Sequence, residues 1–144
     1  MYGFSINLNE RFKEVITRVT VALEEQGFSI LTEIDVKKIL KVKIDVDHLP
    51  YTILGACNPQ LVRQALEVDP DIGLLLPCNV VVRQEEDGSV TVVFMEPAAM
   101  LGLVEKPGIE ALSALVRDKL ERVRIRVAVA AKKVYSGSVV SIKP

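Results

Sequence analysis

Two apolar runs joined by a short acidic turn constrain the fold of this chain more than any other feature. Residues 73–83 are nearly all apolar, and a second run covers residues 89–95. The Asp87-Gly88 pair that precedes the second run is typical of a tight β-hairpin turn. The sequence therefore predicts two neighbouring antiparallel strands. Pro77 has no N–H for a sheet ladder, so it predicts a bulge or a sheet edge in the first of them.

Three more strands are predicted on either side of this hairpin. The segments 2–8, 28–34 and 51–57 are short, apolar or alternating, and bounded by turn residues. A short helix from Asp35 to about residue 43 should separate the second and third of these strands, with the Asp35 carboxylate as its cap. Residues 41–47 alternate strictly, so a strand there is the open alternative.

Helices are predicted where apolar residues recur at spacings of three and four. The first covers residues 12–23; Asn7 or Asn9 can cap its start, and Gly27 can supply the left-handed residue past its end. The next begins at Asn58-Pro59 and ends near residue 68.

The last long helix begins at Ile109 and is expected to end between Arg126 and Ala131. The tail 134–142 is either an added strand or a disordered end. The order β-α-β-β-β-β-α, with short extra helices, predicts an α+β fold.

Length and composition are those of one globular domain. The chain has 144 residues, of which 49% are apolar and 26% charged. No apolar run reaches the roughly 18 residues that span a bilayer, and the N-terminus lacks the pattern of a signal peptide. We therefore expect no membrane association and a cytoplasmic protein, in which the two cysteines are reduced thiols.

The charge is distributed unevenly although the net charge is only −1. From Arg117 onward the chain has eight basic and two acidic residues. A basic end can bind nucleic acid through its phosphates. However, Tyr135 is the only aromatic residue in this tract, and the charges fit the exposed face of a helix. Nucleic acid is therefore not a predicted partner.

Reactive side chains, prolines and turn-forming residues coincide in only two places. These places contribute six candidate ligand-binding residues: Cys57, Asn58, Pro59, Pro77, Cys78 and Asn79. If the two strands that carry the cysteines are neighbours, the thiols can form a redox pair or hold a soft metal. Their spacing is not that of a Cys-x-x-Cys motif, and two thiolates do not complete a tetrahedral site. The alternative is that both are small buried residues.

His48 is the only histidine and follows Asp45 and Asp47. Such a group can ligate a divalent ion or act as a general base. A polar, solvated loop is the favoured interpretation. The sequence therefore predicts no catalytic residue and no metal site, and it names no cofactor.

Four motifs in order along the chain resemble those of one known family. They are Gly27-Phe28 with Thr32-Glu33-Ile34-Asp35, and the segments 53–59, 73–82 and 95–100. In these motifs the chain resembles the domain of unknown function 302 family of bacteria and archaea, from about residue 2 to residue 124. We therefore predict a single domain over residues 1–126 and a C-terminal extension over residues 127–144.

The resemblance implies a fold like one half of the TATA-binding protein. In that fold an antiparallel sheet is covered on one face by helices, and the domain tends to form homodimers. The family has no established biochemical activity, so the resemblance implies a fold but no reaction.

Two functional hypotheses follow. The preferred one is a non-catalytic homodimeric domain that binds a small ligand or a protein in a pocket lined by the two Cys-Asn segments. The alternative is a thiol protein, in which Cys57 and Cys78 form a redox pair or bind a metal or a haem-type cofactor. The first tolerates serine or alanine at both positions with only a packing penalty, whereas the second requires both sulfurs.

Overall fold

The computed structural model describes the backbone of residues 1–137 and the side chains of residues 1–129. Its elements, in chain order, are β1 (Gly3–Leu8), α1 (Phe12–Glu25), β2 (Ser29–Asp35), α2 (Val36–Ile44), β3 (Tyr51–Cys57), α3 (Pro59–Val68), the 3-10 helix η1 (Pro70–Leu75), β4 (Cys78–Gln84), β5 (Val90–Met95), α4 (Pro97–Leu101) and α5 (Ile109–Gly137). The predicted α+β class and the predicted order of the main elements are confirmed.

The five strands form one antiparallel sheet in the order β1-β5-β4-β3-β2. The predicted hairpin is confirmed, because β4 and β5 are paired neighbours in which Val82 lies opposite Val92. Gly88 in the turn between them has φ +88°, a conformation that favours glycine. The β4–β5 hairpin therefore supplies the centre of the sheet.

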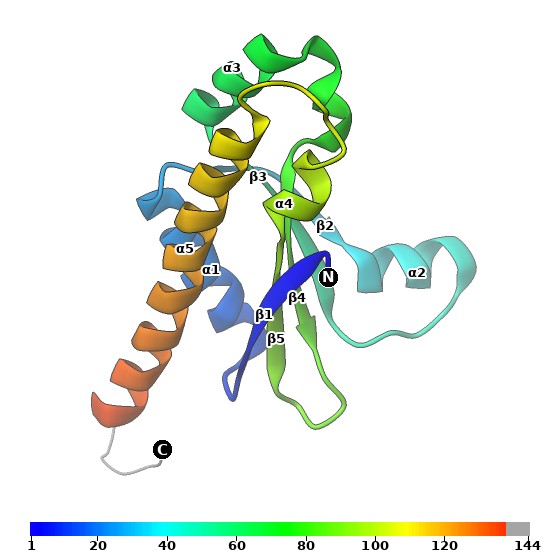
Figure 1. Cartoon of the computed structure of the whole chain (residues 1–144). Coiled ribbons are helices and arrows are strands. Elements are labelled where there is room, and N and C mark those ends of the chain that lie inside the picture. The colour runs from blue at the N-terminus through cyan, green and yellow to red at the C-terminus, as the bar shows by residue number, and fades with distance from the viewer. Residues whose placement is uncertain (138–144) are drawn as a thin grey trace.

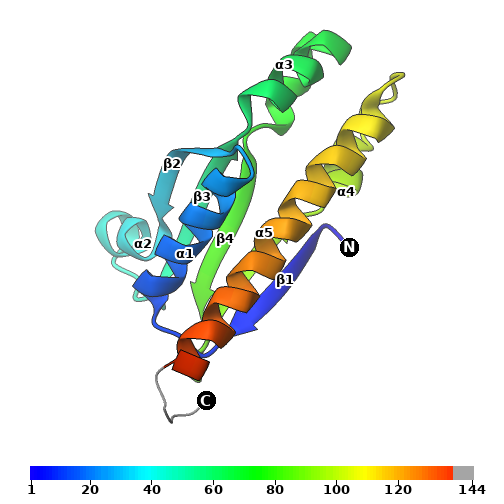
Figure 2. The ribbon, with the colours of Figure 1, turned by 90° about the vertical axis from the view of Figure 1, so that its left-hand side faces the viewer.

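Helices α1 and α5 cover one face of the sheet (Figures 1 and 2). Because side chains alternate along a strand, every second residue of β4 and β5 points to this face. Val80, Val82, Val92 and Phe94 do so and are fully buried. The core therefore lies between this face and the two helices.

The opposite face, here called the open face, carries the alternate residues of the same strands. Tyr51, Ile53, Val81 and Val93 are half-buried there. Helix α2 lies on this side and projects outward from the sheet near β2 (Figure 1). Among the residues that the structure describes, no helix packs across the open face.

Helix α2 is confirmed, and the alternative of a strand over residues 41–47 is wrong. The Asp35 carboxylate caps the helix by accepting a hydrogen bond of 3.0 Å from Lys38 N. The helix ends at Ile44 because Asp45 adopts a left-handed conformation, with φ 54°. No side chain of α2 is buried.

Pro77 lies neither at a bulge nor on an edge strand. Strand β4 is internal to the sheet and begins only after the proline, at Cys78. Residues 73–75, which were expected to start the strand, belong to the 3-10 helix η1 instead. The Asp69 side chain caps η1 by accepting a hydrogen bond of 2.9 Å from Asp71 N. The prediction was wrong because the apolar run contains two elements.

The predicted cap of α1 is also wrong. Its N-cap is Arg11, which makes no side-chain capping bond. Asn7 instead donates hydrogen bonds of 3.0 Å to the hydroxyls of Ser89 and Thr91 and so ties β1 to the start of β5. Gly27, with φ +86°, does end the helix as expected.

Helix α5 is longer than predicted, because it continues without a break to Gly137. The expected boundary between residues 126 and 127 falls inside this helix, and Val127 is part of the buried core. The segment 134–142 begins within the helix, and residues 138–142 lie outside the described part of the chain. Within the described residues, no helix is both long and apolar enough for a membrane span.

Candidate functional site

Three sulfur-bearing residues meet at one end of the sheet. Cys57 is the last residue of β3, Cys78 is the first of β4, and Met95 is the last of β5. Because β3, β4 and β5 are antiparallel neighbours, these three positions lie at the same end of the sheet. The chain leaves the sheet there after β3, forms α3 and η1, and returns as β4.

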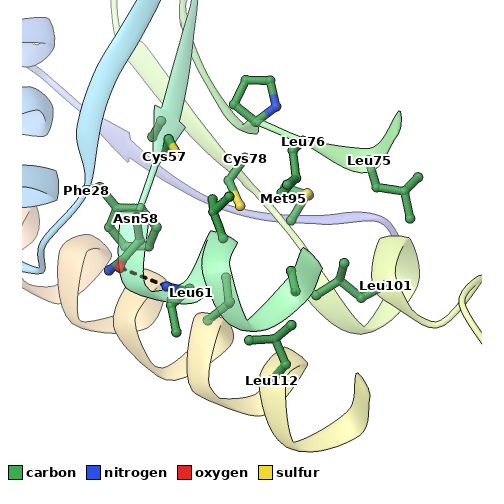
Figure 3. A pocket seen from close by; sticks show the side chains of 15 residues that line it. Phe28, Cys57, Asn58, Leu61, Leu75, Leu76, Cys78, Met95, Leu101 and Leu112 are labelled. Atoms are coloured by element: carbon green, nitrogen blue, oxygen red, sulfur yellow. Dashed lines mark hydrogen bonds between the residues drawn. The ribbon is translucent and has the colours of Figure 1, made fainter. Parts of the chain in front are cut away.

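The sheet end, α3, α4 and α5 enclose a small apolar cavity of about 30 Å³ (Figure 3). The strand side carries Cys57, Cys78 and Met95. The helical side carries apolar residues, namely Leu61, Val62 and Ala65 from α3, Leu101 from α4, and Leu112 and Val116 from α5. Phe28, Ala56, Asn58, Leu75, Leu76 and Pro77 complete the wall. This volume suits one or two atoms the size of water, not an extended ligand.

Asn58 is buried in the cavity wall and both ends of its amide are occupied. Its Oδ1 accepts from Leu61 N at 3.3 Å as the N-cap of α3, and its Nδ2 donates to Gln26 O at 3.2 Å. A Cβ on Gly27 would stand 3.1 Å from Nδ2, so the glycine leaves room for this contact. The Asn58 side chain therefore fixes the start of α3 and ties it to the residue that follows α1.

The six candidate residues do not all face the cavity. Cys57, Asn58, Pro77 and Cys78 line it. Pro59 occupies the first turn of α3 and is exposed. Asn79 lies opposite Gly55 and lines a separate groove on the open face. The candidate set therefore divides between two surfaces.

Sequence reasoning missed Met95 and the contribution of α5 to the cavity. A thioether at a strand end has no pattern of its own, and the position becomes informative only once the order β3-β4-β5 is known. The apolar spacing of α5 predicted a buried stripe, to which Leu112 and Val116 belong, but not what that stripe would cover.

The two thiols differ in environment. Both are free; Cys57 is partly exposed and Cys78 is buried. Cys78 lies opposite Ala56, so Cys57 is not its cross-strand partner. Burial, with a smaller contribution from Cys57, raises the pKa of the Cys78 thiol to about 11. Cys78 therefore stays protonated at neutral pH and is a poor nucleophile.

We expect a chromogenic disulfide reagent to modify only one cysteine of the native protein below about pH 9, namely Cys57. The thiolate is the reacting form, so the Cys78 rate should rise only as pH approaches its pKa of about 11. Stopped-flow absorbance across pH measures both rates. Cys57→Ser and Cys78→Ser variants assign them, and a Cys78 rate equal to that of Cys57 at pH 8 would contradict the expectation.

His48 lies away from the cavity. It is exposed, its Nδ1 is 2.7 Å from Leu49 O, and its ring meets Tyr51 edge-on. The neighbouring carboxylates of Asp45 and Asp47 are engaged by Lys41 at 3.0 and 3.1 Å, and these contacts raise the pKa of Lys41. Within the described residues, no group of three His, Cys, Asp or Glu side chains is placed to hold a metal ion.

The comparisons with known proteins agree with this fold. No curated protein matches the chain. A crystal structure of an uncharacterised conserved protein, DUF302, from Bacillus stearothermophilus matches with a TM-score of 0.82 and 27% identity, over 88% of this chain and 98% of that one. The family model described as domain of unknown function DUF302 matches residues 4–127. The chain therefore belongs to the DUF302 family.

Proposed function

We propose that this protein is a non-catalytic, homodimeric cytoplasmic module that binds a small ligand or a protein partner. The observation that carries the ligand-binding part is the cavity at the end of the sheet, which lies where three strand ends and three helices meet. Its wall is apolar apart from the two thiols and the occupied amide of Asn58. Such a wall suits binding, because it offers no side chain ready for proton transfer.

The homodimer is supported by helix α2. A nine-residue helix is marginal on its own in water, and helices in proteins are held mainly by burying an apolar stripe. Yet Ile39, Val42 and Ile44 are all exposed, with Val42 at 69%. On nearby strand β2, Leu31 and Ile34 are exposed as well. A patch of this kind marks an interaction surface.

A second copy of the chain is the occupant that fits this patch. The open face and α2 lie on the same side of the molecule, so a twofold axis can place α2 of each protomer on the open face of the other (Figure 1). The receiving surface is a groove of about 400 Å³ lined by Tyr2, Tyr51, Val81 and Val93 among others. The net charge of −1 gives little repulsion between copies.

Size-exclusion chromatography with light scattering tests the dimer. We expect the native protein at micromolar concentration to have twice the 15.9 kDa mass of the chain. Val42→Glu should weaken the dimer at least roughly 30-fold, because it places a charge in the centre of the apolar contact. Val21→Glu is the matched control, since Val21 is also a helical valine, 49% exposed, on the covered side of the sheet.

A monomeric native protein, or a Val42→Glu protein that dimerises as tightly as the Val21→Glu protein, would overturn the proposed dimer. Circular dichroism on both variants shows whether each remains folded, so that dissociation is not mistaken for unfolding.

Nucleic acid is left out of the proposal because four arginines of α5 have acidic partners. Arg117 contacts Glu96 and Glu121, Arg124 contacts Glu121 as well, and Arg122 contacts Asp118 at 2.8 Å. Arg126 reaches Glu25 at 3.3 Å. These pairs lower the positive potential that a phosphate backbone needs.

A second candidate function, a thiol protein, is favoured by one observation, which is that Cys57 and Cys78 line the same cavity. The redox form of this hypothesis is the weaker one, because Cys78 is buried and its pKa is raised to about 11.

A further inference from the structure

A second hollow lies between α4 and the first half of α5, which pack against each other (Figures 1 and 2). This hollow, here called the α4–α5 groove, has a volume of about 290 Å³. Among the described residues, Leu101 is the only one that lines both the groove and the cavity at the sheet end, so the two spaces are separate. The buried part of the groove wall is apolar, since Leu101 and Ile109 are 5% and 7% exposed. The groove therefore offers room and an apolar surface for a small molecule.

Ser113 is a polar side chain of this groove that the fold does not use. It lies on α5 and is 8% exposed, so more than nine-tenths of it is buried. Among the described residues, its hydroxyl has no hydrogen-bond partner. A buried hydroxyl that makes no hydrogen bond is unfavourable, but Ser113 lines the groove, where a bound molecule can supply the missing bond. The Ser113 hydroxyl is therefore available to a ligand.

The charges around the groove favour a cation. Glu110 precedes Ser113 by three residues, and within the described part of the chain its carboxylate has no ion-pair partner. Arg117 is the one basic side chain among the described residues of the wall, and its guanidinium is already engaged by Glu96 and Glu121, both at 2.9 Å. Glu96 and Glu110 thus give the wall two negative charges against one positive charge. This excess attracts a cationic ligand and repels an anionic one.

We propose that the α4–α5 groove binds a primary alkylammonium ion, with the Glu110 carboxylate and the Ser113 hydroxyl as its hydrogen-bond acceptors. Residues three apart on a helix lie on the same face, with their Cβ atoms about 5–6 Å apart. One ammonium nitrogen has three donors, so it can bond to both groups. The alkyl chain of the ligand packs on Leu101 and Ile109.

The apolar wall selects an organic cation over a metal ion, because Ca²⁺ or Mg²⁺ would need roughly six or more oxygen ligands. The site goes beyond the proposed function, because it lies outside the cavity at the sheet end. The ammonium group can belong to a free amine or to a lysine side chain of a partner, and the test includes both sources.

The test is a titration of the full-length protein with butylammonium, followed by the amide signals in heteronuclear NMR spectra. We expect the signals of residues 98–102 and 109–114 to shift together, with a Kd that is roughly millimolar because the ligand is small. Butanol and butyrate are of similar size but lack the positive charge, and they should bind at least roughly 5-fold more weakly. A short peptide with one lysine and blocked ends is the second arm. Binding of this peptide as tight as that of butylammonium assigns the site to a partner's lysine, and weaker binding assigns it to a free amine.

Two variants test the proposed acceptors. Glu110→Gln removes the charge at nearly constant size and should weaken butylammonium binding roughly 5-fold. Ser113→Ala removes the hydroxyl and should weaken it roughly 3-fold. Glu105→Gln is the matched control, since Glu105 is also exposed and lies shortly before α5 but does not line the groove. Its affinity should equal that of the native protein.

Equal affinity of the native protein and either the Glu110→Gln or the Ser113→Ala protein would overturn the site. Butyrate binding as tight as that of butylammonium would overturn it too, as would shifts confined to residues outside the groove. Both variants should fold, because Glu110 is exposed and alanine is a better helix former than serine, and circular dichroism verifies this. Light scattering on the same samples separates the proposals: a native dimer that does not bind butylammonium overturns this site and leaves the dimer standing.

Discussion

Replacing Phe94 with alanine is expected to lower the free energy of unfolding by about 3–5 kcal/mol. Phe94 is fully buried near the end of β5, and its ring stacks on that of Phe4 with centroids 5.4 Å apart. It lies opposite Val80 on β4 and Phe4 on β1, so its removal opens a cavity between three strands and the covering helices. The Phe4 ring, which Phe94 holds in place, also makes a cation–π contact with Arg117, whose guanidinium lies 3.7 Å above it, so this contact would be weakened as well.

Urea unfolding followed by circular dichroism measures this loss. Val93→Ala is the control, because Val93 is the next residue along β5 but points to the open face, where it is half-buried. It should cost less than about 1.5 kcal/mol in the isolated chain, since fewer contacts are lost. If Phe94→Ala and Val93→Ala cost the same, the division of the sheet into a covered and an open face would be wrong.

Replacing Glu10 with glutamine is expected to cost about 3 kcal/mol of stability, near the lower end of the range for breaking a buried ion pair. The Glu10 carboxylate pairs with the Arg18 guanidinium, and the two side chains are only 7% and 16% exposed. Within the described residues, Nη1 of Arg18 is buried without a hydrogen-bond partner. Among the described residues, loss of the Glu10 charge would leave the exposed Glu14, 3.8 Å away, as the ion-pair partner of this guanidinium.

Glu14→Gln provides the comparison. Glu14 contacts the same arginine, but its side chain is 51% exposed, so its removal should cost less than about 1 kcal/mol. Denaturant unfolding of both variants at low and high salt separates the two cases, because salt screens an exposed pair far more than a buried one. Equal costs for the two variants would show that the Glu10–Arg18 pair is effectively solvated.

Much of the sheet was predictable from local sequence. Strand β3 and helix α3 were predicted at the bounds observed, because Asn58-Pro59 marks the boundary between them with a cap and a first-turn proline. The β4–β5 hairpin was predictable from its Asp-Gly turn. In each case the residues within a short window determine the conformation, and tertiary contacts reinforce it.

The errors arose where tertiary contacts decide. Asn7 is a good capping residue in isolation, but Ser89 and Thr91, more than 80 residues later, offer it better partners. The segment 73–83 reads as one apolar strand, yet its first part forms η1. Apolarity predicts burial and does not distinguish a strand from the turn that precedes it.

The candidate site was predictable only in part, because its local segments can be recognised in the sequence but the way they come together depends on the strand order. Turn residues and thiols coincide in the two Cys-Asn segments, which predicts a site there, and four of the six candidate residues line one cavity. The separation of Asn79 onto the open face follows from strand alternation once β4 is known to begin at Cys78. Met95 required the strand order, which no local pattern contains.

The pairing of Ala56 with Cys78 has a consequence for how this fold can vary. Residues 58–77, which include α3 and η1, leave the sheet at the end of β3 and rejoin it at the start of the neighbouring strand β4. For these two strands, the whole segment is one long hairpin connection. The entropy of closing such a connection changes only slowly with its length. Insertions, deletions or substitutions between β3 and β4 can therefore change one wall of the cavity without changing the register of the sheet.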